Sequence, residues 1–297
     1  MKPQLSLRDG LLALAVVFVW GTNFVVIRLG LDVLPPLFFA TLRFVFVLLP
    51  ACFFLPRPKA SWANLTFYGL AIGLGQFGLL FIAMNGRISP GLASLVVQMQ
   101  VFFTIGLSLW RGGEKVRPHQ LAAFAIALAG MAVIMAHNDK GATVAGVLMC
   151  LAAALCWAIG NQASKEAGRI NALSYVIWSS LFAAPPLLLL SLAKEGWPAI
   201  AHGLSQAGPW TWVAMGWQSF GNSLFGFGCW AWLLSRYPAA TVSPMSLLVP
   251  LFGFAASALW LGEPIQPWKI AATVLVLTGL AINLFWGRIK TPVSSSP

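Results

Sequence analysis

Runs of about 20 apolar residues recur along almost the whole chain, and such a run is what a helix needs to cross a hydrocarbon core of about 30 Å. Because backbone polar groups must find partners within the segment in lipid, these runs can span a membrane only as helices. We therefore expect an all-α integral membrane protein with ten transmembrane helices. Apolar windows between Gly, Pro and charged residues predict spans at 10–28, 36–55, 65–85, 91–110, 119–136, 144–164, 173–193, 210–235, 240–261 and 267–286.

The composition agrees with this class, since 59% of the residues are hydrophobic and 8% are charged. A sizeable soluble domain has no room between the spans. The first apolar run follows two basic residues as a signal peptide would, but Trp20, Asn23 and Arg28 stand where small cleavage-site residues would be. We interpret it as an uncleaved first span.

The 18 Lys and Arg residues are distributed unevenly over alternate loops. With a cytoplasmic N-terminus, 12 of them fall on the cytoplasmic side, five on the outer side, and one, Arg43, inside a span. This asymmetry predicts a multi-pass protein of the bacterial inner membrane with both termini cytoplasmic. The basic residues form no continuous face, so we expect a lipid bilayer and no nucleic acid as partner.

The chain also repeats itself. The Gly-Glu pairs at 113–114 and 262–263 are 149 residues apart, and so are Pro118 and Pro267. Ten spans then divide into two five-helix repeats. Because five is odd, the second copy enters the membrane the opposite way round, which is the arrangement of many transporters.

The two expected repeats are residues 1–140 and 141–297 of one membrane unit. Such inverted halves can exchange roles in opening to either side of a fixed central site. A transporter working by alternating access is therefore the leading interpretation.

None of the seven acidic residues lies at the middle of a predicted span. We therefore expect transport down the substrate gradient without an obligatory ion. The same absence argues against a membrane-embedded enzyme, which needs a nucleophile with a base, paired carboxylates or a metal. The four cysteines and three histidines show no metal-ligand spacing, so we expect neither a metal nor a cofactor.

Neutral amides are the polar groups that the spans do contain, and several share a helix face with an aromatic ring one turn away. A cavity lined in this way could bind a small zwitterion through amides and pack its side chain against rings. The alternative is that the amides only join helices to one another. The predicted substrate-binding residues are Trp20, Asn23, Arg43, Gln76, Gln98, Phe102, Trp157, Asn161 and Asn222.

Arg43 is the one charge well inside a predicted span, and its counterpart in the second repeat is Ser179. The architecture alone therefore does not require the charge. It could attract a substrate carboxylate, or it could snorkel outward or cap carbonyl groups of a neighbouring helix.

Several short segments together resemble the drug/metabolite transporter superfamily, specifically its EamA-type ten-helix exporters. The resemblance covers nearly the whole chain and includes the segments 20–24, 42–44, 91–94 and 246–250 and the two Gly-Glu turns. Within that family the sequence is most similar to bacterial exporters of amino acids and cysteine-pathway metabolites. The resemblance implies small zwitterionic substrates and a cavity formed mainly by spans one, three, four, six, eight and nine.

We therefore expect an inner-membrane exporter of small neutral amino acids or amino-acid-derived metabolites. A permease for another small solute, such as a sugar or nucleoside derivative, remains the nearest alternative. A membrane-embedded enzyme and a purely structural protein are the alternatives from other classes.

Overall fold

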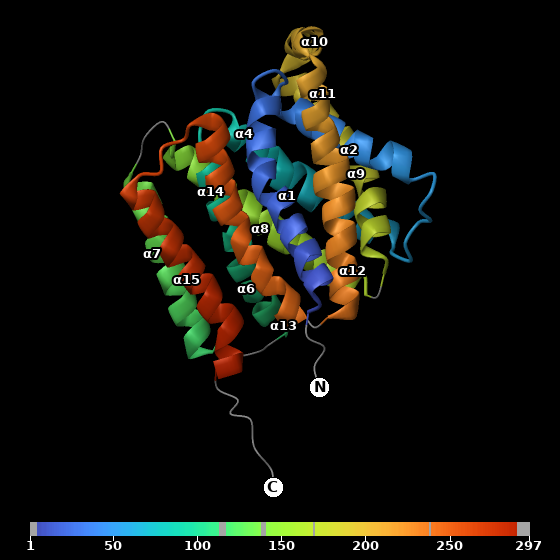
Figure 1. Cartoon of the computed structure of the whole chain (residues 1–297). Helices are drawn as coiled ribbons and strands as arrows, with labels where there is room; N and C mark the ends of the chain where they lie inside the picture. Colours follow the sequence, from blue (N-terminus) through green and yellow to red (C-terminus); the bar gives the residue numbers. More distant parts are fainter. Residues whose placement is uncertain (1–4, 113–116, 138–140, 169, 238, 290–297) are drawn as a thin grey trace.

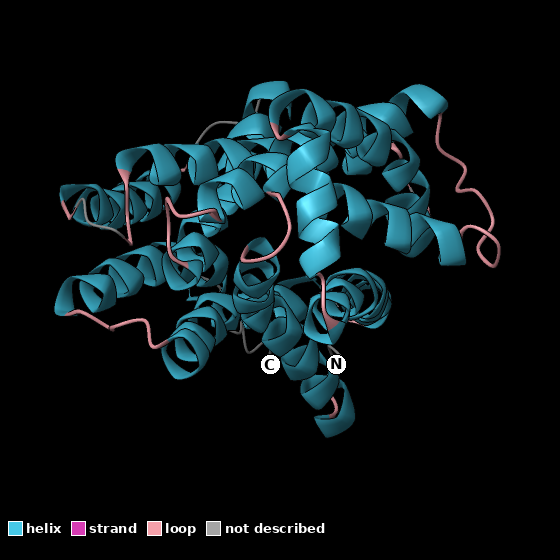
Figure 2. Ribbon diagram, turned by 90° about the horizontal axis from the view of Figure 1, so that it is seen from above, coloured by secondary structure: helices cyan, strands magenta, loops and turns pink. Residues whose placement is uncertain are grey.

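The computed structural model describes residues 5–112, 117–137, 141–168, 170–237 and 239–289, and the description below refers to these ranges. Within them the chain is helical and contains no strand (Figure 1). Figure 2, seen from above, shows the helices gathered into one bundle with short loops between them. An isolated backbone bridge joins Ile88 to Ala142.

Six helices of the bundle are regular from end to end. They are α1 (Leu7–Leu31), α2 (Pro36–Ala51), α7 (Pro118–Ala136), α8 (Val144–Glu166), α9 (Ala172–Lys194) and α15 (Pro267–Ile289).

Four further segments change their helix type along the way. The first segment consists of α3 (Trp62–Gly69), π-helical η1 (Leu70–Gly78) and α4 (Leu79–Met84). The second consists of α5 (Pro90–Val96), 3₁₀-helical η2 (Val97–Met99) and α6 (Gln100–Gly112). The third segment consists of α11 (Pro209–Gly216), π-helical η3 (Trp217–Phe227) and α12 (Gly228–Arg236). The fourth consists of α13 (Ala239–Val242), 3₁₀-helical η4 (Ser243–Leu247) and α14 (Leu248–Leu261).

Eight of these segments, among the described residues, are long and apolar enough to cross a membrane, and α2 is a shorter apolar helix. The remaining expected span, 210–235, is helical without a break from α11 to α12. Its Gln, Ser, Asn and Gly residues make it less apolar than the eight. The predicted span 36–55 is also shorter than expected, because α2 ends at Ala51.

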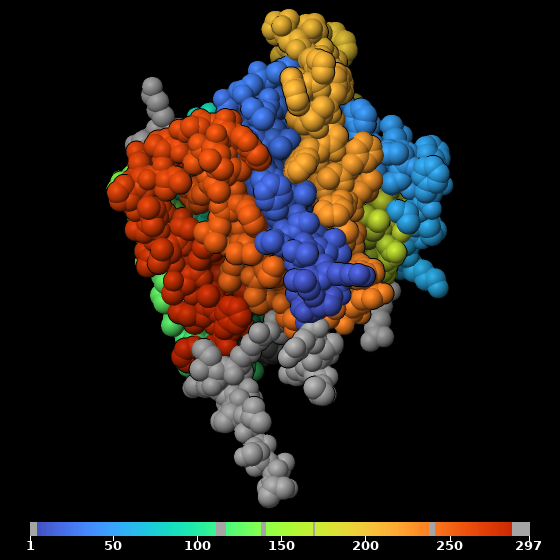
Figure 3. Space-filling view, viewed as in Figure 1, coloured from blue at the N-terminus to red at the C-terminus, as the bar shows by residue number. Residues whose placement is uncertain are grey.

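Helix pairs from the two halves of the chain pack against each other throughout the bundle. α7 lies along α15, α2 along α9, and α5 along α14. Figure 3 shows α1 between α14 on one side and the segment α11 to α12 on the other. The contact of α1 with α14 is close, since a Cβ atom built on Gly21 would lie 2.6 Å from the Val249 carbonyl oxygen. Small residues of this kind let two helix backbones approach closely.

One helix was not expected from the sequence. α10 (Gly196–Gln206) lies at the end of the bundle opposite the start of α1 (Figure 1). Its 11 residues are too short for an apolar span, and it has buried positions such as Ile200 and Gly203. Gly203 packs on the carbonyl group of Val33, so α10 covers the turn between α1 and α2.

Glu195, which precedes α10, joins that end of α9 to the start of α2. Its carboxylate accepts hydrogen bonds from the backbone N–H groups of Leu37 at 2.7 Å and Phe38 at 3.1 Å. These are among the N–H groups that a helix start leaves without partners, and a negative charge there also suits the helix dipole. Ser191 donates a third hydrogen bond, at 2.6 Å.

Candidate functional site

A cavity of about 620 Å³ lies inside the bundle. α1, η1, η2, α6, α8, η3, α12 and η4 all contribute side chains to its wall. Seven of the nine predicted substrate-binding residues line it, which brings both halves of the chain to one place. These seven are Trp20, Asn23, Gln76, Gln98, Trp157, Asn161 and Asn222. That they contact a substrate stays a prediction.

A small amide and hydroxyl cluster lies on the side of the cavity formed by α6 and α8. The Nδ2 group of Asn161 donates hydrogen bonds to Gln100 Oε1 at 3.1 Å and to Thr104 Oγ1 at 3.2 Å. Gln100 and Thr104 are one helical turn apart, so both face α8. The cluster holds Asn161 in one orientation within the cavity wall.

Aromatic rings form another part of the cavity wall. The indole Nε1 of Trp20 donates a hydrogen bond to the carbonyl oxygen of Asn222 at 3.2 Å. Trp230 and Phe227 lie beside Trp20, with ring centroids 5.1 Å and 5.6 Å from it. Tilted pairs of this kind are favourable, and the indole keeps its N–H satisfied. The wall therefore offers apolar ring surfaces that are inclined to one another.

The lining of this cavity contains no carboxylate, imidazole, ammonium or guanidinium group among the described residues. Amides can donate and accept hydrogen bonds, so such a wall can bind both poles of a zwitterion. A solute with a net charge would leave its hydration shell without gaining a partner of opposite charge, which is costly. The chemistry therefore suits a small neutral or zwitterionic molecule with an apolar part.

The lining reaches residues near the ends of several helices. Ser164 lies at the end of α8, Ala172 begins α9, and Leu234 and Leu284 lie near the ends of α12 and α15. In Figure 1 the ends of α12 and α15 lie at the same end of the bundle as the start of α1. The cavity therefore extends toward that end.

Phe102 lies outside this lining, contrary to the expectation that it shares a face with Gln98. Its ring packs against Phe124 of α7, with 5.6 Å between the centroids. The 3₁₀ turn η2 between the two positions is the physical reason. A 3₁₀ helix turns about 20° more per residue than an α-helix, so Gln100, Val101 and Thr104 take the cavity face instead.

Arg43 also lies outside the lining and is 1% exposed. Its Nη2 group donates a hydrogen bond to Ser223 Oγ at 3.0 Å. Its guanidinium carbon lies 3.5 Å from the ring centroid of Phe77, and Phe77 is itself part of the cavity wall. Neither snorkelling nor carbonyl capping describes this position, because the group is enclosed and bonds a side chain.

A buried ion pair lies at the far end of the bundle from the start of α1. Lys269 donates a hydrogen bond to Glu263 at 2.8 Å, and the two side chains are 4% and 10% exposed. Glu263 also accepts hydrogen bonds from Ser89 Oγ at 2.5 Å and from Ser257 Oγ. Burial by itself would raise the pKa of the Glu263 carboxyl, but the hydrogen bonds from Lys269, Ser257 and Ser89 together hold it below its usual value.

A smaller cavity of about 370 Å³ adjoins this ion pair. Arg28 and Asp32 form its charged rim and bond each other at 2.7 Å. The two cavities have no lining residue in common. The contacts around Glu263 therefore belong to a separate region.

Sequence reasoning missed several residues of the main cavity. Gln100 and Thr104 carry a signal that could have found them, since they are polar and one turn apart on a predicted span. Trp230 and Phe227 carry no such signal, because neither is paired with an amide on its own helix face. Within the described ranges no group of three or more His, Cys, Asp or Glu side chains could hold a metal ion.

Comparison with known proteins places these observations in a family. The family model described as "EamA-like transporter family" matches the chain twice, over residues 9–136 and 144–285. A crystal structure described as "Crystal structure of protein" has a TM-score of 0.62 and 19% identity, covering 96% of this chain and 99% of its own. That likeness concerns the fold alone.

Curated relatives align over nearly the full length. Proteins of Salmonella typhimurium (strain LT2) and Escherichia coli (strain K12), each named "Probable amino-acid metabolite efflux pump", are both 42% identical to this chain. The alignments cover 96% and 97% of this chain and 98% and 99% of the relatives. A "Probable terminal-alkyne amino-acid exporter" of Streptantibioticus cattleyicolor is 25% identical, with 90% of each chain covered.

Proposed function

The chain belongs to the EamA-like transporter family, and from this premise we propose that it exports small neutral amino acids, or metabolites derived from them, by alternating access. One observation carries the proposal. The cavity of about 620 Å³ combines amides from both halves of the chain with aromatic rings and has no charged side chain in its described lining. A molecule with an ammonium, a carboxylate and an apolar side chain matches that wall.

The family and the eight long apolar helices identify a multi-pass membrane transporter rather than an enzyme. The two relatives at 42% identity are named as amino-acid metabolite efflux pumps, and their alignment over almost the whole length supports a substrate of the same class here. Export is therefore the direction that we propose.

We further propose that the chain crosses the membrane ten times as two inverted five-helix repeats, residues 1–140 and 141–297. The two separate matches of one family model support this division. The helix types support it as well, since π-helical η1 falls within π-helical η3 when it is shifted by 149 residues, and 3₁₀-helical η2 and η4 overlap at the same offset. Finally, α2 pairs with α9 and α7 with α15, which are the corresponding spans of the two repeats.

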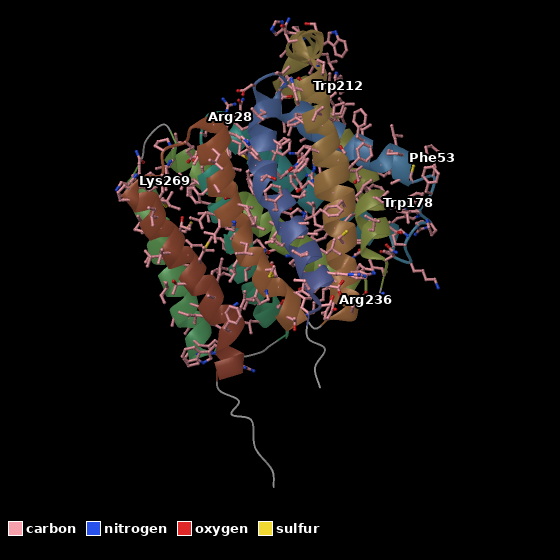
Figure 4. The ribbon with its side chains drawn as sticks, in the orientation of Figure 1. Arg28, Phe53, Trp178, Trp212, Arg236 and Lys269 are labelled. Carbon is pink, nitrogen blue, oxygen red and sulfur yellow. The ribbon has the colours of Figure 1, made fainter. Side chains whose placement is uncertain are left out.

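We propose that the cavity faces the cytoplasm in this conformation. Figure 4 places Arg28 and Lys269 at one end of the bundle and Arg236 at the other. The uneven distribution of basic residues assigns Arg236, the N-terminus and the C-terminus to the cytoplasmic side. The cavity lining extends toward that same end, so a substrate would enter from the cytoplasm and the region around Glu263 would close the outer side.

In this proposal the seven predicted residues that line the cavity divide into three roles. Asn23, Gln76, Asn161 and Asn222 offer amide groups to the charged poles of the substrate, and Trp20 and Trp157 pack against its side chain. Gln98 stabilises the wall, because it donates a hydrogen bond to the carbonyl oxygen of Ser246 at 3.2 Å and joins the two repeats.

Proteoliposomes containing the purified protein test the substrate class directly. They are loaded with labelled neutral amino acids, a labelled sugar or a labelled nucleoside, and loss of label is compared with protein-free vesicles. We expect release of neutral amino acids alone. Release confined to the sugar or nucleoside would favour the alternative permease, and chemical conversion of a substrate without a second compartment would favour an enzyme.

A further inference from the structure

Arg43 is a buried cation without an acidic partner in the described structure. The ion pairs found there join Arg28 to Asp32 and Lys269 to Glu263, and neither includes Arg43. Its Nε and Nη1 groups are fully enclosed and have no hydrogen-bond partner among the described residues. Burying an unpaired charge is costly, so a charge kept in this position needs a compensating role.

Phe77 separates this cation from the cavity. Phe77 lines the cavity, and its ring centroid lies 3.5 Å from the guanidinium carbon of Arg43. A guanidinium over an aromatic face is stabilised while it has no anion. Phe77 belongs to the π-helical segment η1, and π-helical turns occur frequently at functional sites.

A chain of hydrogen bonds also joins Arg43 to the cavity wall. Arg43 donates to Ser223, Ser223 donates to the carbonyl oxygen of Gln218 at 3.0 Å, and Gln218 donates to the carbonyl oxygen of Asn23 at 3.5 Å. Asn23 lines the cavity, and its Oδ1 atom is buried without a partner. This series of hydrogen bonds therefore has N–H donors without a partner at Arg43 and an acceptor without a partner at Asn23. A carboxylate needs such donors, and an ammonium group needs such an acceptor.

We infer that Arg43 is the carboxylate subsite of the cavity, and that Phe77 covers it until a substrate carboxylate displaces the ring. This inference rests on the proposed function and names the group that the site recognises. The guanidinium has N–H groups without a partner at Nε and Nη1, and a carboxylate can accept a charge-assisted hydrogen bond there. The substrate ammonium then faces Asn23 and the amide wall, and Phe77 takes a position beside the substrate side chain.

Binding measurements on matched ligand pairs test the inference. The probes are L-leucine, L-methionine and L-phenylalanine, each compared with its amide, because the amide keeps the ammonium and side chain but lacks the carboxylate. The proteins are the wild type, Arg43→Gln, Arg43→Lys and the control Arg28→Gln, which removes a partly exposed arginine at the opposite end from the start of α1. Calorimetric titration gives an affinity for each pair.

We expect the wild type and Arg28→Gln to prefer the amino acid over its amide by about tenfold or more. Arg43→Gln should lose this preference and bind the amide as the wild type does, and Arg43→Lys should retain part of it. Removal of an unpaired buried charge should also leave the thermal midpoint of the empty protein unchanged or higher. Equal binding of acids and amides by the wild type, or an unchanged preference in Arg43→Gln, would overturn the inference and leave the proposed function standing.

The remaining outcomes are also distinguishable. Loss of folded protein in both Arg43 variants would identify a structural role for the cation and would contradict the inference. Replacement of chloride by gluconate should change nothing; affinity or stability that depends on chloride, with no preference for the carboxylate, would assign the subsite to an inorganic anion. Failure of all six probes to bind the wild type would overturn the proposed substrate class itself.

Discussion

Glu263 accepts a hydrogen bond from Ser89 at 2.5 Å, so a carboxylate after α14 is joined directly to the residue that precedes α5. The backbone N–H group of Gly91 in α5 donates another hydrogen bond to the Glu263 carboxylate, at 3.3 Å. Together with the ion pair to Lys269, these contacts hold segments of the two halves of the chain together at the end opposite the start of α1. In the proposed alternating-access cycle, these are contacts that an opening at this end of the bundle would have to break.

Replacement of Glu263 by Gln should destabilise the protein substantially. The substitution leaves the buried Lys269 ammonium without its counter-ion, and breaking a buried pair in this way costs about 3–5 kcal/mol. Thermal unfolding in detergent measures the effect. Asp32→Asn is the matched control, because it removes an exposed pair with Arg28 that contributes at most about 1 kcal/mol. A double variant, Glu263→Gln with Lys269→Met, should recover most of the loss.

The Glu263 carboxylate should make the stability of the protein depend on pH in the acid range. The folded-state pKa of Glu263 lies below its usual value of 4.5, so its contribution is fully present above that value and is lost as the pH falls through the folded-state pKa. The difference in thermal midpoint between wild type and Glu263→Gln should therefore shrink from about pH 6 to about pH 3. A constant difference across this range would contradict the assignment.

Asn161→Ala and Trp157→Ala should reduce transport more than they reduce folding. Loss of one hydrogen bond to a substrate costs about 0.5–1.5 kcal/mol, which is about a two- to tenfold loss of affinity, and it costs more when the partner is charged. Flux per folded molecule in proteoliposomes measures this effect. Gln162→Ala and Trp210→Ala serve as controls, because Gln162 bonds Glu166 and Trp210 is 81% exposed.

If both cavity variants keep normal flux and apparent affinity but lose thermal stability, the amide and aromatic cluster only joins helices. Asn161 could have such a role, because its hydrogen bonds to Gln100 and Thr104 join α8 to α6. The controls separate the two roles, since a defect shared by Gln162→Ala would point to general instability.

Both termini should lie in the cytoplasm. Fluorescent-protein fusions at the C-terminus should be fluorescent, and alkaline phosphatase fused after Lys194 at the end of α9 should be active outside. The reason is the excess of Lys and Arg on the side shared by the termini. An external C-terminus would exclude the five-plus-five inverted arrangement.

Transport should need no obligatory ion. The described lining of the main cavity contains no carboxylate that could bind a proton or sodium ion next to the substrate. Proteoliposomes with an imposed proton gradient should therefore equilibrate a neutral amino acid without accumulating it. Accumulation driven by the gradient alone would show coupling and contradict the prediction.

Helix positions follow from the sequence more closely than helix geometry does. Hydropathy places the start of α15 at Pro267 and the end of α7 at Ala136, because both are bounded by loop residues. It cannot find η1 or η3, since a wider turn leaves no mark in an apolar pattern. It also treats α10 as a loop, because 11 mixed residues form a helix here only by packing on the α1–α2 turn.

For the candidate site, too, the sequence predicts positions on regular helices but not the effects of helix geometry and packing. One-turn pairing of amides with rings was sufficient to predict that Trp157 and Asn161 line one cavity. It failed for Phe102, because the 3₁₀ turn η2 rotates the face that follows. It could not show that Phe77 covers Arg43, because that contact joins α2 to η1 and depends on how the two segments pack.

The close contact at Gly21 has a consequence for how the cavity wall can move. Two helices whose side chains interlock must separate before either one can be displaced, whereas α1 and α14 meet at Gly21 through backbone and small groups. A contact of this kind at Gly21 resists sliding along the helix axes less than interlocked side chains would, and sliding of packed helices is shear rather than hinge motion. A substitution as small as Gly21→Ala would add a ridge to this surface.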